Sequence, residues 1–236
     1  MSRHNLVVVR AGDKSLHPQW LHADRSWDLC VSYYGDYPER YKGQYDFVHC
    51  CKGSKWQGLS HFLLAHGDRI ARYEYVWFPD DDLFATHETI NNFFHLTKQL
   101  DLTISQPALT EYSFYGWEIT LRKAQCAARL TDFVEIMAPC FKVKDFEYFK
   151  STFAENSSGF GLEWLWKKIA ADHQILRFGI IDATPVFHTR KVGSAGHGGS
   201  VSSPRREMMD LLQRHELQAT KPMILQEIKF KNLNEN

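Results

Sequence analysis

Three consecutive aspartates, Asp80, Asp81 and Asp82, follow Pro79 and the apolar run 75–78. Neighbouring carboxylates repel one another and are costly to desolvate. A bound divalent cation offsets that repulsion, and Mg²⁺ and Mn²⁺ prefer oxygen ligands. If the apolar run is a buried strand, such a metal would lie beyond its carboxyl end, where open α/β sheets bind ligands. The alternative is an acidic turn that stabilises the N-terminus of the next helix.

One histidine, His188, stands near the end of the last apolar run and is followed by Arg190 and Lys191. A neutral imidazole is able to complete the coordination of a metal held by carboxylates, and cations neutralise diphosphates. A lone histidine is more often structural or simply exposed, so this interpretation depends on the aspartates. Together, these residues predict a metal site with cations beside it for a diphosphate.

Glu163 comes at the start of a stretch whose apolar residues repeat with helical spacing, after Gly159 and Gly161. Glycines let the backbone approach a ligand closely, and a carboxylate there is able to accept a proton from a sugar hydroxyl. An equally simple alternative is that the helix dipole favours a glutamate in the first turn. We expect the helix to aim Glu163 at a cleft, with the glycines leaving room for a sugar ring.

Two turns combine small residues with cations, one over residues 10–15 after the first apolar run and one over residues 51–55 after the third. Free N–H groups collect at strand-to-helix transitions and bind phosphate. Neither turn matches the Walker A or dinucleotide-binding pattern, and lysine and glycine are also ordinary surface-turn residues. The candidate nucleotide-binding residues in these turns are Arg10, Gly12, Ser15, Lys52 and Lys55.

Aromatic residues cluster in the segment 112–117 and around residues 160–166. Sugars stack their apolar faces on such rings, and tryptophan and tyrosine also donate hydrogen bonds. Core packing is the alternative, and it is the better interpretation for Trp166, which belongs to the helical stripe. The candidate acceptor-binding residues are Tyr115, Trp117, Phe160 and Trp164.

The candidate site residues would come together at one edge of a sheet if the apolar runs are strands and helices connect them. Several apolar runs do not alternate with polar residues, which indicates strands covered on both faces and hence a mostly parallel sheet. Helical spacing separates these runs and appears again from Pro204 to Leu212. We predict an α/β, Rossmann-like fold whose central sheet of about seven strands is flanked by helices. The expected strands lie in 6–9, 29–34, 47–51, 75–78, 102–105, 133–137 and 178–181.

Composition limits the function classes. Lys plus Arg and Asp plus Glu both number 28, so the basic excess of a general nucleic-acid binder is missing. The sequence has five cysteines without regular spacing and no run of about 20 apolar residues. We therefore expect a cytoplasmic protein without a membrane span, and a single domain over residues 1–236. The Gly/Ser-rich segment 193–203 is predicted to be a flexible loop that becomes ordered when a ligand binds, followed by a C-terminal helical segment.

The order of these motifs resembles the GT-A glycosyltransferases. Within them, the chain is similar to an uncharacterised family, a domain of unknown function that is widespread in land plants. The resemblance covers residues 45–193, and the N-terminal region fits the fold only loosely. It rests on the segments 78–82 (FPDDD), 133–139 (FVEIMAP), 159–163 (GFGLE) and 182–188 (DATPVFH).

The resemblance implies a role for each matching position. Asp82 and His188 would bind the metal, Mn²⁺ or Mg²⁺, while Asp80 or Asp81 would share it or contact the ribose. The chain has Trp164 where beta-1,4-galactosyltransferases have a catalytic aspartate, so Glu163 would have to serve as the base in an inverting reaction. The implied reaction transfers a sugar from a nucleoside-diphosphate sugar to a hydroxyl acceptor.

The departure at Trp164 leaves other functions open. The mechanism could be retaining, or the chain could be a catalytically silent domain that binds a sugar or nucleotide. A phosphohydrolase with an aspartate nucleophile also places acidic residues after a strand. Such enzymes use the first strand and follow the motif with Thr or Val, whereas here the motif follows the fourth apolar run and precedes Leu83.

Overall fold

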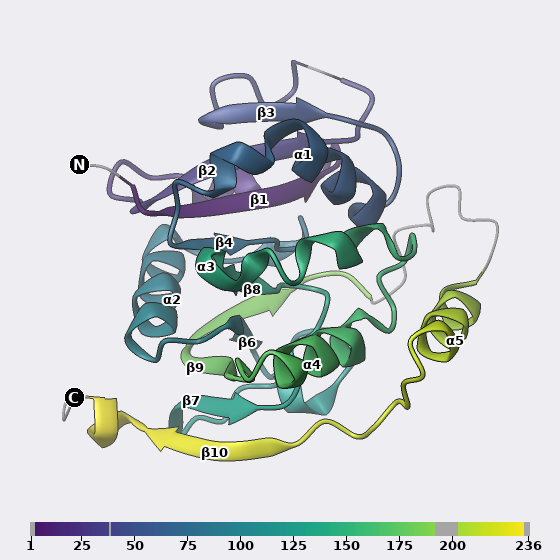
Figure 1. The fold of residues 1–236 in the computed structure, drawn as a ribbon. Coiled ribbons are helices and arrows are strands. Elements are labelled where there is room, and N and C mark those ends of the chain that lie inside the picture. Colours follow the sequence, from purple (N-terminus) through teal and green to yellow (C-terminus); the bar gives the residue numbers. More distant parts are fainter. Residues whose placement is uncertain (1–2, 38, 192–202, 234–236) are drawn as a thin grey trace.

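A ten-stranded sheet with helices on both faces forms the centre of the protein (Figure 1). This computed structural model describes residues 3–37, 39–191 and 203–233. The predicted loop 193–203 therefore lies, except for Ser203, outside the described residues. Within the described ranges, no helix combines the length and the apolar character needed to cross a lipid bilayer.

The elements alternate along the chain as an α/β fold requires. The strands are β1 (Asn5–Ala11), β2 (Trp27–Tyr33), β3 (Phe47–Cys50), β4 (Tyr75–Trp77), β5 (Leu83–Phe84), β6 (Ile104–Leu109), β7 (Cys126–Thr131), β8 (Cys140–Lys142), β9 (Phe178–His188) and β10 (Ile224–Lys229). The α-helices are α1 (Lys55–Ile70), α2 (His87–Gln99), α3 (Val143–Phe146), α4 (Leu162–Asp172) and α5 (Pro204–Arg214). Short 3-10 helices span His17–Trp20, Glu118–Thr120, Lys150–Ala154 and Phe230–Leu233.

The strand order in the sheet is β10-β7-β9-β6-β8-β4-β1-β2-β3, and β5 pairs separately with β9. Strand β1 is parallel to β2 and β4, β2 is parallel to β3, and β6 is parallel to β9. Strands β7 and β8 run antiparallel to their neighbours. The carboxyl ends of β1, β4 and β9 consequently lie at the same edge, and the sheet is mostly parallel as predicted, with more strands than expected.

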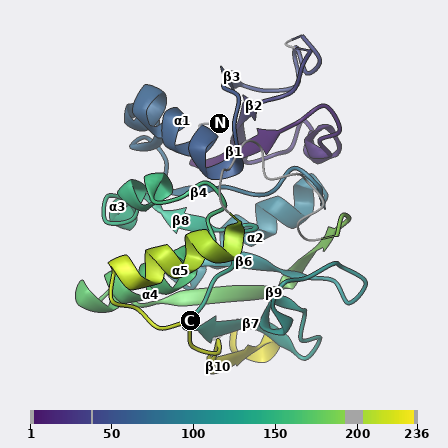
Figure 2. The same ribbon diagram turned by 90° about the vertical axis from the view of Figure 1, so that its right-hand side faces the viewer.

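Each face of the sheet buries its own apolar core. Leu6 and Val8 of β1 belong to the core that contains α1, α3, α4 and α5, whereas Val7 and Val9 belong to the core that contains α2. The alternation follows from the two-residue period of a strand. Figure 2 shows the two helical layers on opposite sides of the sheet. Burial on both faces explains why these strands read as continuous apolar runs.

The start of α1 is fixed by a capping box. Ser54 accepts a hydrogen bond from the backbone of Gln57, whose side chain in turn accepts one from the Ser54 N–H. This arrangement satisfies N–H groups that have no partner inside the helix. The helix therefore begins at Lys55, directly after the turn that follows β3.

The predicted strand 133–137 was wrong, because this segment is an irregular loop between β7 and β8. Its apolar residues are buried by ring packing, with Phe133 against Trp117 and Trp164, and not by strand pairing. The true strand β7 was missed because it contains Arg129, which breaks the apolar pattern. A buried salt bridge to Asp182, with Nη2 and Oδ1 2.8 Å apart, compensates that charge.

Candidate active site

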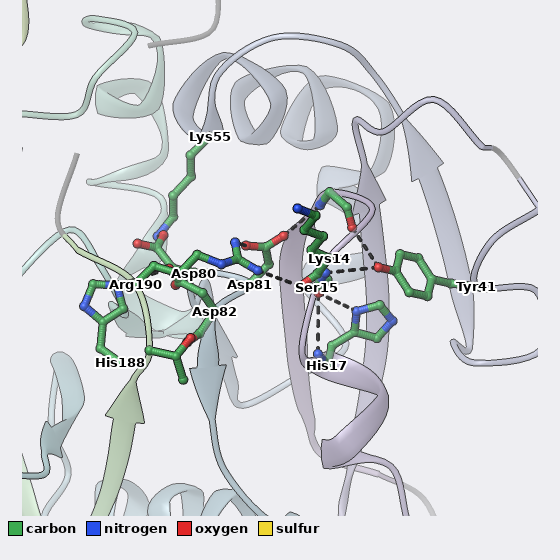
Figure 3. A network of polar contacts seen from close by, with 12 residues as sticks. Lys14, Ser15, His17, Tyr41, Lys55, Asp80, Asp81, Asp82, His188 and Arg190 are labelled. Carbon is green, nitrogen blue, oxygen red and sulfur yellow. Dashed lines mark hydrogen bonds and ion pairs between the residues drawn. The ribbon is translucent and has the colours of Figure 1, made fainter. Parts of the chain in front are cut away.

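The aspartate triplet crosses the carboxyl end of the sheet between β4 and β5 (Figure 3). Strand β5 pairs antiparallel with the end of β9, and this register places Leu83 opposite His188. The pairing of two short segments therefore holds the triplet beside a histidine about a hundred residues further along the chain. It also explains why β9 extends well beyond the predicted strand 178–181.

Asp82 and His188 face one another at the centre of the site, with His188 Nε2 3.3 Å from Asp82 Oδ2. His188 Nδ1 lies 2.6 Å from the Phe114 carbonyl oxygen. A carbonyl only accepts, so Nδ1 carries the proton and Nε2 points at the carboxylate. Burial lowers the pKa of His188, but its hydrogen bond with Asp82 and the Asp82 charge outweigh this and leave the pKa raised.

The donor atoms fit a divalent cation. One ligand atom from each of Asp80, Asp82 and His188 lies within 4.8 Å of the other two. Asp82 Oδ1 is buried, and no group in the described part of the chain hydrogen bonds to it. A buried carboxylate oxygen without a partner is costly, and an ion would satisfy it. The hydrogen bond from His188 Nδ1 to a carbonyl is also the usual second contact of a metal-binding histidine.

Asp80 is tied to the start of α1. Its Oδ1 lies 2.6 Å from Lys55 Nζ, which also donates to the carbonyl oxygens of Ile136 and Met137, each at 2.8 Å. Burial raises the pKa of Asp80, while the Lys55 charge acts in the opposite direction. Lys55 therefore joins three segments at the site, and its predicted phosphate contact would compete with these bonds.

Asp81 connects the triplet to the turn after β1. Its carboxylate accepts a 2.8 Å hydrogen bond from Gly12 N and lies 3.2 Å from Arg190 Nη1. Arg190 also donates to the Lys14 carbonyl oxygen at 2.6 Å. Burial raises the pKa of Asp81 to about 6. Beside this turn, an open pocket of about 380 Å³ is lined by Asp13, Lys14, Ser15, Pro18, Arg40, Tyr41 and Gln44.

Arg10 and Lys52, two further predicted nucleotide-binding cations, also bond to protein groups. The guanidinium of Arg10 is buried and donates to the backbone carbonyl oxygens of Ser32, Cys51, Gly53 and Ser54. Arg10 therefore holds the turn after β3, and its guanidinium would have to leave these carbonyl oxygens to contact a phosphate. Lys52 bonds to Asp36 and the Gly35 carbonyl oxygen on the surface. Lys191 is exposed next to Arg190.

Glu163 lies at the first turn of α4 and is only 4% exposed. The backbone N–H of Gly161 donates a hydrogen bond to its carboxylate at 3.2 Å. Burial nevertheless raises the pKa of Glu163 to about 7. The expectation that this carboxylate faces an open cleft was wrong for this conformation, because protein atoms cover it.

Sequence reasoning missed a second buried carboxyl, Glu135, in the loop that was taken for a strand. Its backbone N–H donates to Gln106 Oε1 at 2.6 Å, and its Oε2 is buried without a hydrogen-bond partner in the described structure. Burial, reinforced by the charges of Glu163 and Asp80, raises the pKa of Glu135 to about 8. Glu135 was overlooked because the segment was interpreted as a strand. A single acidic residue inside an apolar run could have indicated a buried carboxyl group.

The space beside the two glycines is filled by the protein. A Cβ atom on Gly159 would lie 1.9 Å from Trp56 Nε1, and one on Gly161 would lie 3.3 Å from a Leu211 methyl carbon. The φ values of Gly159 and Gly161 are 78° and 100°, a backbone conformation that residues with a Cβ atom rarely adopt. They therefore allow close packing and the entry into α4, and they leave no room for a sugar ring in this conformation.

The predicted acceptor-binding aromatic residues separate into two pairs. Trp117 and Trp164 pack on each other with ring centroids 5.7 Å apart. Trp164 is buried and its Nε1 donates to the Thr220 carbonyl oxygen, so an acceptor would reach its ring only after this packing opens. Tyr115 and Phe160 are exposed and remain available to a ligand.

We expect the free energy of unfolding to fall by several kcal/mol as the pH rises from 5 to 8. Burial raises the pKa values of Asp81, Glu163 and Glu135 to about 6, 7 and 8. Over this range, the unfolded chain binds fewer protons than the folded chain, so stability decreases with pH. Urea unfolding of the parent and of Glu135→Gln at each pH measures the effect. The variant should lose less stability with rising pH, and parallel curves would contradict the assignment.

The comparisons with known proteins agree with this fold. A family model described as "Protein of unknown function (DUF707)" matches residues 28–232. No curated protein matches the chain. The similar solved structures include S. aureus TarS and GalNAc-T7. S. aureus TarS is 10% identical with a TM-score of 0.50, and GalNAc-T7 with UDP, GalNAc and Mn²⁺ is 12% identical with a TM-score of 0.58.

The alignments cover 89% of this chain in each case, but only 43% of TarS and 47% of GalNAc-T7. A shorter form, TarS 1-349 in complex with UDP-GlcNAc, is 11% identical, and 64% of it is covered with a TM-score of 0.50. The chain thus spans less than two thirds of these structures. At such low identity, the similarity establishes the shared fold.

Proposed function

The chain belongs to the DUF707 family, and we propose that it is a metal-dependent glycosyltransferase. In this proposal it moves a sugar from a nucleoside-diphosphate sugar to a hydroxyl acceptor. The observation that carries the proposal is the convergence of Asp80, Asp82 and His188, with a buried Asp82 oxygen that lacks a partner among the described residues. The similar structures of TarS 1-349 with UDP-GlcNAc and of GalNAc-T7 with UDP, GalNAc and Mn²⁺ support the same donor class.

Asp80, Asp82 and His188 would hold the ion, Mn²⁺ or Mg²⁺, which would neutralise charge on the departing diphosphate. The nucleotide would lie over the turn after β1, where the pocket around Ser15 opens beside Asp81. Arg190 and Lys191 follow β9 on the same side of the site and would contact the diphosphate. Binding there would require Arg190 to exchange its bond to Asp81 for one to phosphate.

Glu163 would accept the proton of the attacking hydroxyl in an inverting reaction. A pKa of about 7 suits a general base, because half of the carboxyl groups are ionised near neutral pH while the group still binds a proton well. Access to Glu163 requires the residues that cover it to move, because its side chain is only 4% exposed. Tyr115, whose ring is exposed, would then contact the acceptor.

The second candidate is a catalytically silent domain that binds a sugar or nucleotide. The buried Trp164 at the position of a catalytic aspartate, together with the covered Glu163, favours this candidate. Both candidates would bind a nucleotide at the same site, but only the transferase would turn over. An assay for hydrolysis of a nucleoside-diphosphate sugar therefore distinguishes the transferase from the silent domain.

We expect UDP with Mn²⁺ to raise the unfolding temperature by about 5–10 °C at a concentration 100-fold above its Kd, because the ligand binds only the folded state. UDP alone should have a smaller effect, since its diphosphate would then face the aspartates without the neutralising ion. Differential scanning fluorimetry with a panel of nucleoside diphosphates, each with and without Mn²⁺, makes the measurement. Unchanged unfolding temperatures throughout the panel would reject a nucleotide site.

A further inference from the structure

We propose that His49, Cys51 and His61 form a second metal site, selective for Zn²⁺, that fastens the turn after β3 to α1. One ligand atom from each of these residues lies within 4.8 Å of the other two. Two imidazole nitrogens and a thiolate are the ligands that Zn²⁺ prefers. The site shares no ligand with the aspartate triplet, so it does not depend on the proposed transferase activity.

The two imidazoles already point their ring nitrogens at one another, with His49 Nε2 2.8 Å from His61 Nδ1. Such a contact requires at least one neutral ring, which is the form that binds metals. A tetrahedral Zn²⁺ with Zn–N bonds of ~2.0–2.1 Å would separate the nitrogens by about 3.3 Å. The rings therefore need to part by only about half an ångström to admit the ion.

His49 is held in the orientation that a metal ligand needs. Its Nδ1 lies 2.9 Å from Ser32 Oγ, so Nε2 is directed away from the sheet toward α1. With Nε2 bound to a metal, Nδ1 would donate to this hydroxyl, the type of second contact that orients ligating histidines. His49 is 6% exposed, whereas His61 is exposed, so an ion could enter from the solvent side.

Cys51 is positioned by its backbone. Its N–H donates to the Tyr33 carbonyl oxygen at 3.0 Å, and its carbonyl oxygen accepts from Arg10 Nη2 at 2.6 Å. The side chain is thereby fixed between β3 and α1, with Sγ 3.2 Å from the Lys52 carbonyl oxygen. Binding Zn²⁺ would release the thiol proton. The thiolate would also reduce the repulsion between the ion and the nearby Arg10 guanidinium.

Ligand chemistry distinguishes the two metal sites. The triplet site offers carboxylate oxygens and one imidazole, which suit Mn²⁺ and Mg²⁺, whereas the second site adds sulfur. Co²⁺ replaces Zn²⁺ and shows an intense near-ultraviolet charge-transfer band only when a thiolate binds it. This band reports on Cys51 without any assay of activity.

We expect the full chain, titrated with Co²⁺, to develop this band and to lose it when Zn²⁺ is added. Cys51→Ser should abolish the band, while Cys50→Ser, at the neighbouring exposed cysteine, should keep it. His61→Ala should lower Zn²⁺ affinity by at least about 10–100-fold, the loss that even outer-shell partners produce. His66→Ala is its control, because His66 lies on the same helix and packs edge-on against His49 outside the ligand group.

Asp82→Asn should leave the band unchanged, since the triplet contributes no ligand here. Absence of the band in the parent chain overturns the proposal, as does a band that survives Cys51→Ser. Equal loss of Zn²⁺ affinity in His61→Ala and His66→Ala also overturns it. His61 is exposed, so its variant tests the site even if Cys51→Ser fails to fold.

Discussion

Asp82→Asn should weaken Mn²⁺ binding by about 10²-fold or more and reduce donor hydrolysis by about 10²–10³-fold. The asparagine keeps the shape of the side chain but removes the charge that faces His188 Nε2 at 3.3 Å. Donor affinity in the presence of Mn²⁺ should fall with it, because the diphosphate and the ion bind together. Titration with Mn²⁺, followed by the electron paramagnetic resonance signal of the free ion, measures metal affinity directly.

Asp81→Asn is the matched control for this experiment. Asp81 lies next in the chain, but it bonds to Gly12 N and Arg190 and stands outside the proposed ligand group. Its variant should leave the Mn²⁺ affinity of the chain near that of the parent. If Asp82→Asn and the parent bind Mn²⁺ equally well, the metal assignment of the triplet is wrong.

The Asp82–His188 contact was predictable because it depends on strand direction. Residues that follow buried parallel strands gather at one edge, so a triplet after β4 and a histidine ending β9 were expected together. The β5–β9 pairing that completes the contact was not predictable, since β5 spans only Leu83–Phe84. A strand of two residues is too short to show an alternation of apolar and polar residues in the sequence. Its pairing is decided by tertiary packing.

Other parts of the site escaped prediction because long-range partners decide them. Arg10 reads as a surface cation in a glycine-containing turn, yet backbone carbonyls from a distant turn bury it. The same applies to Arg129, whose buried partner Asp182 lies in β9. A sequence pattern shows where a charged residue stands. It does not show the distant partner that offsets the desolvation cost when that charge is buried. Glu135 was missed for a related reason. An apolar segment that is buried by ring packing in a loop has the same sequence pattern as a buried strand.

Lys55 illustrates a third limit. Its place at the start of α1 was expected to favour phosphate, and the structure adds contacts to Asp80 and to the loop that carries Glu135. Lys55 therefore connects the aspartate triplet and the start of α1 to this loop.

Glu163→Gln should reduce donor hydrolysis and sugar transfer by about 10²–10⁴-fold, the usual contribution of a general base, while nucleotide affinity barely changes. Burial raises the pKa of Glu163 to about 7, so the parent rate should increase as the pH rises through about 7 and the carboxyl ionises. Glutamine is close to glutamate in size but does not titrate. The residual rate of the variant should therefore not increase as the pH rises through 7. Steady-state rates at each pH, with nucleotide affinity measured separately, test both statements.

Glu135→Gln is the control that separates the two buried carboxyls. Burial raises the pKa of Glu135 to about 8, so this group is mostly protonated at pH 7 and is a poor base there. Its variant should keep much of the parent rate and keep the rate increase near pH 7. If Glu135→Gln abolishes turnover and Glu163→Gln does not, the base lies in the loop between β7 and β8. If Glu163→Gln reacts at the parent rate, Glu163 only stabilises the start of α4, and an inverting reaction through it is wrong.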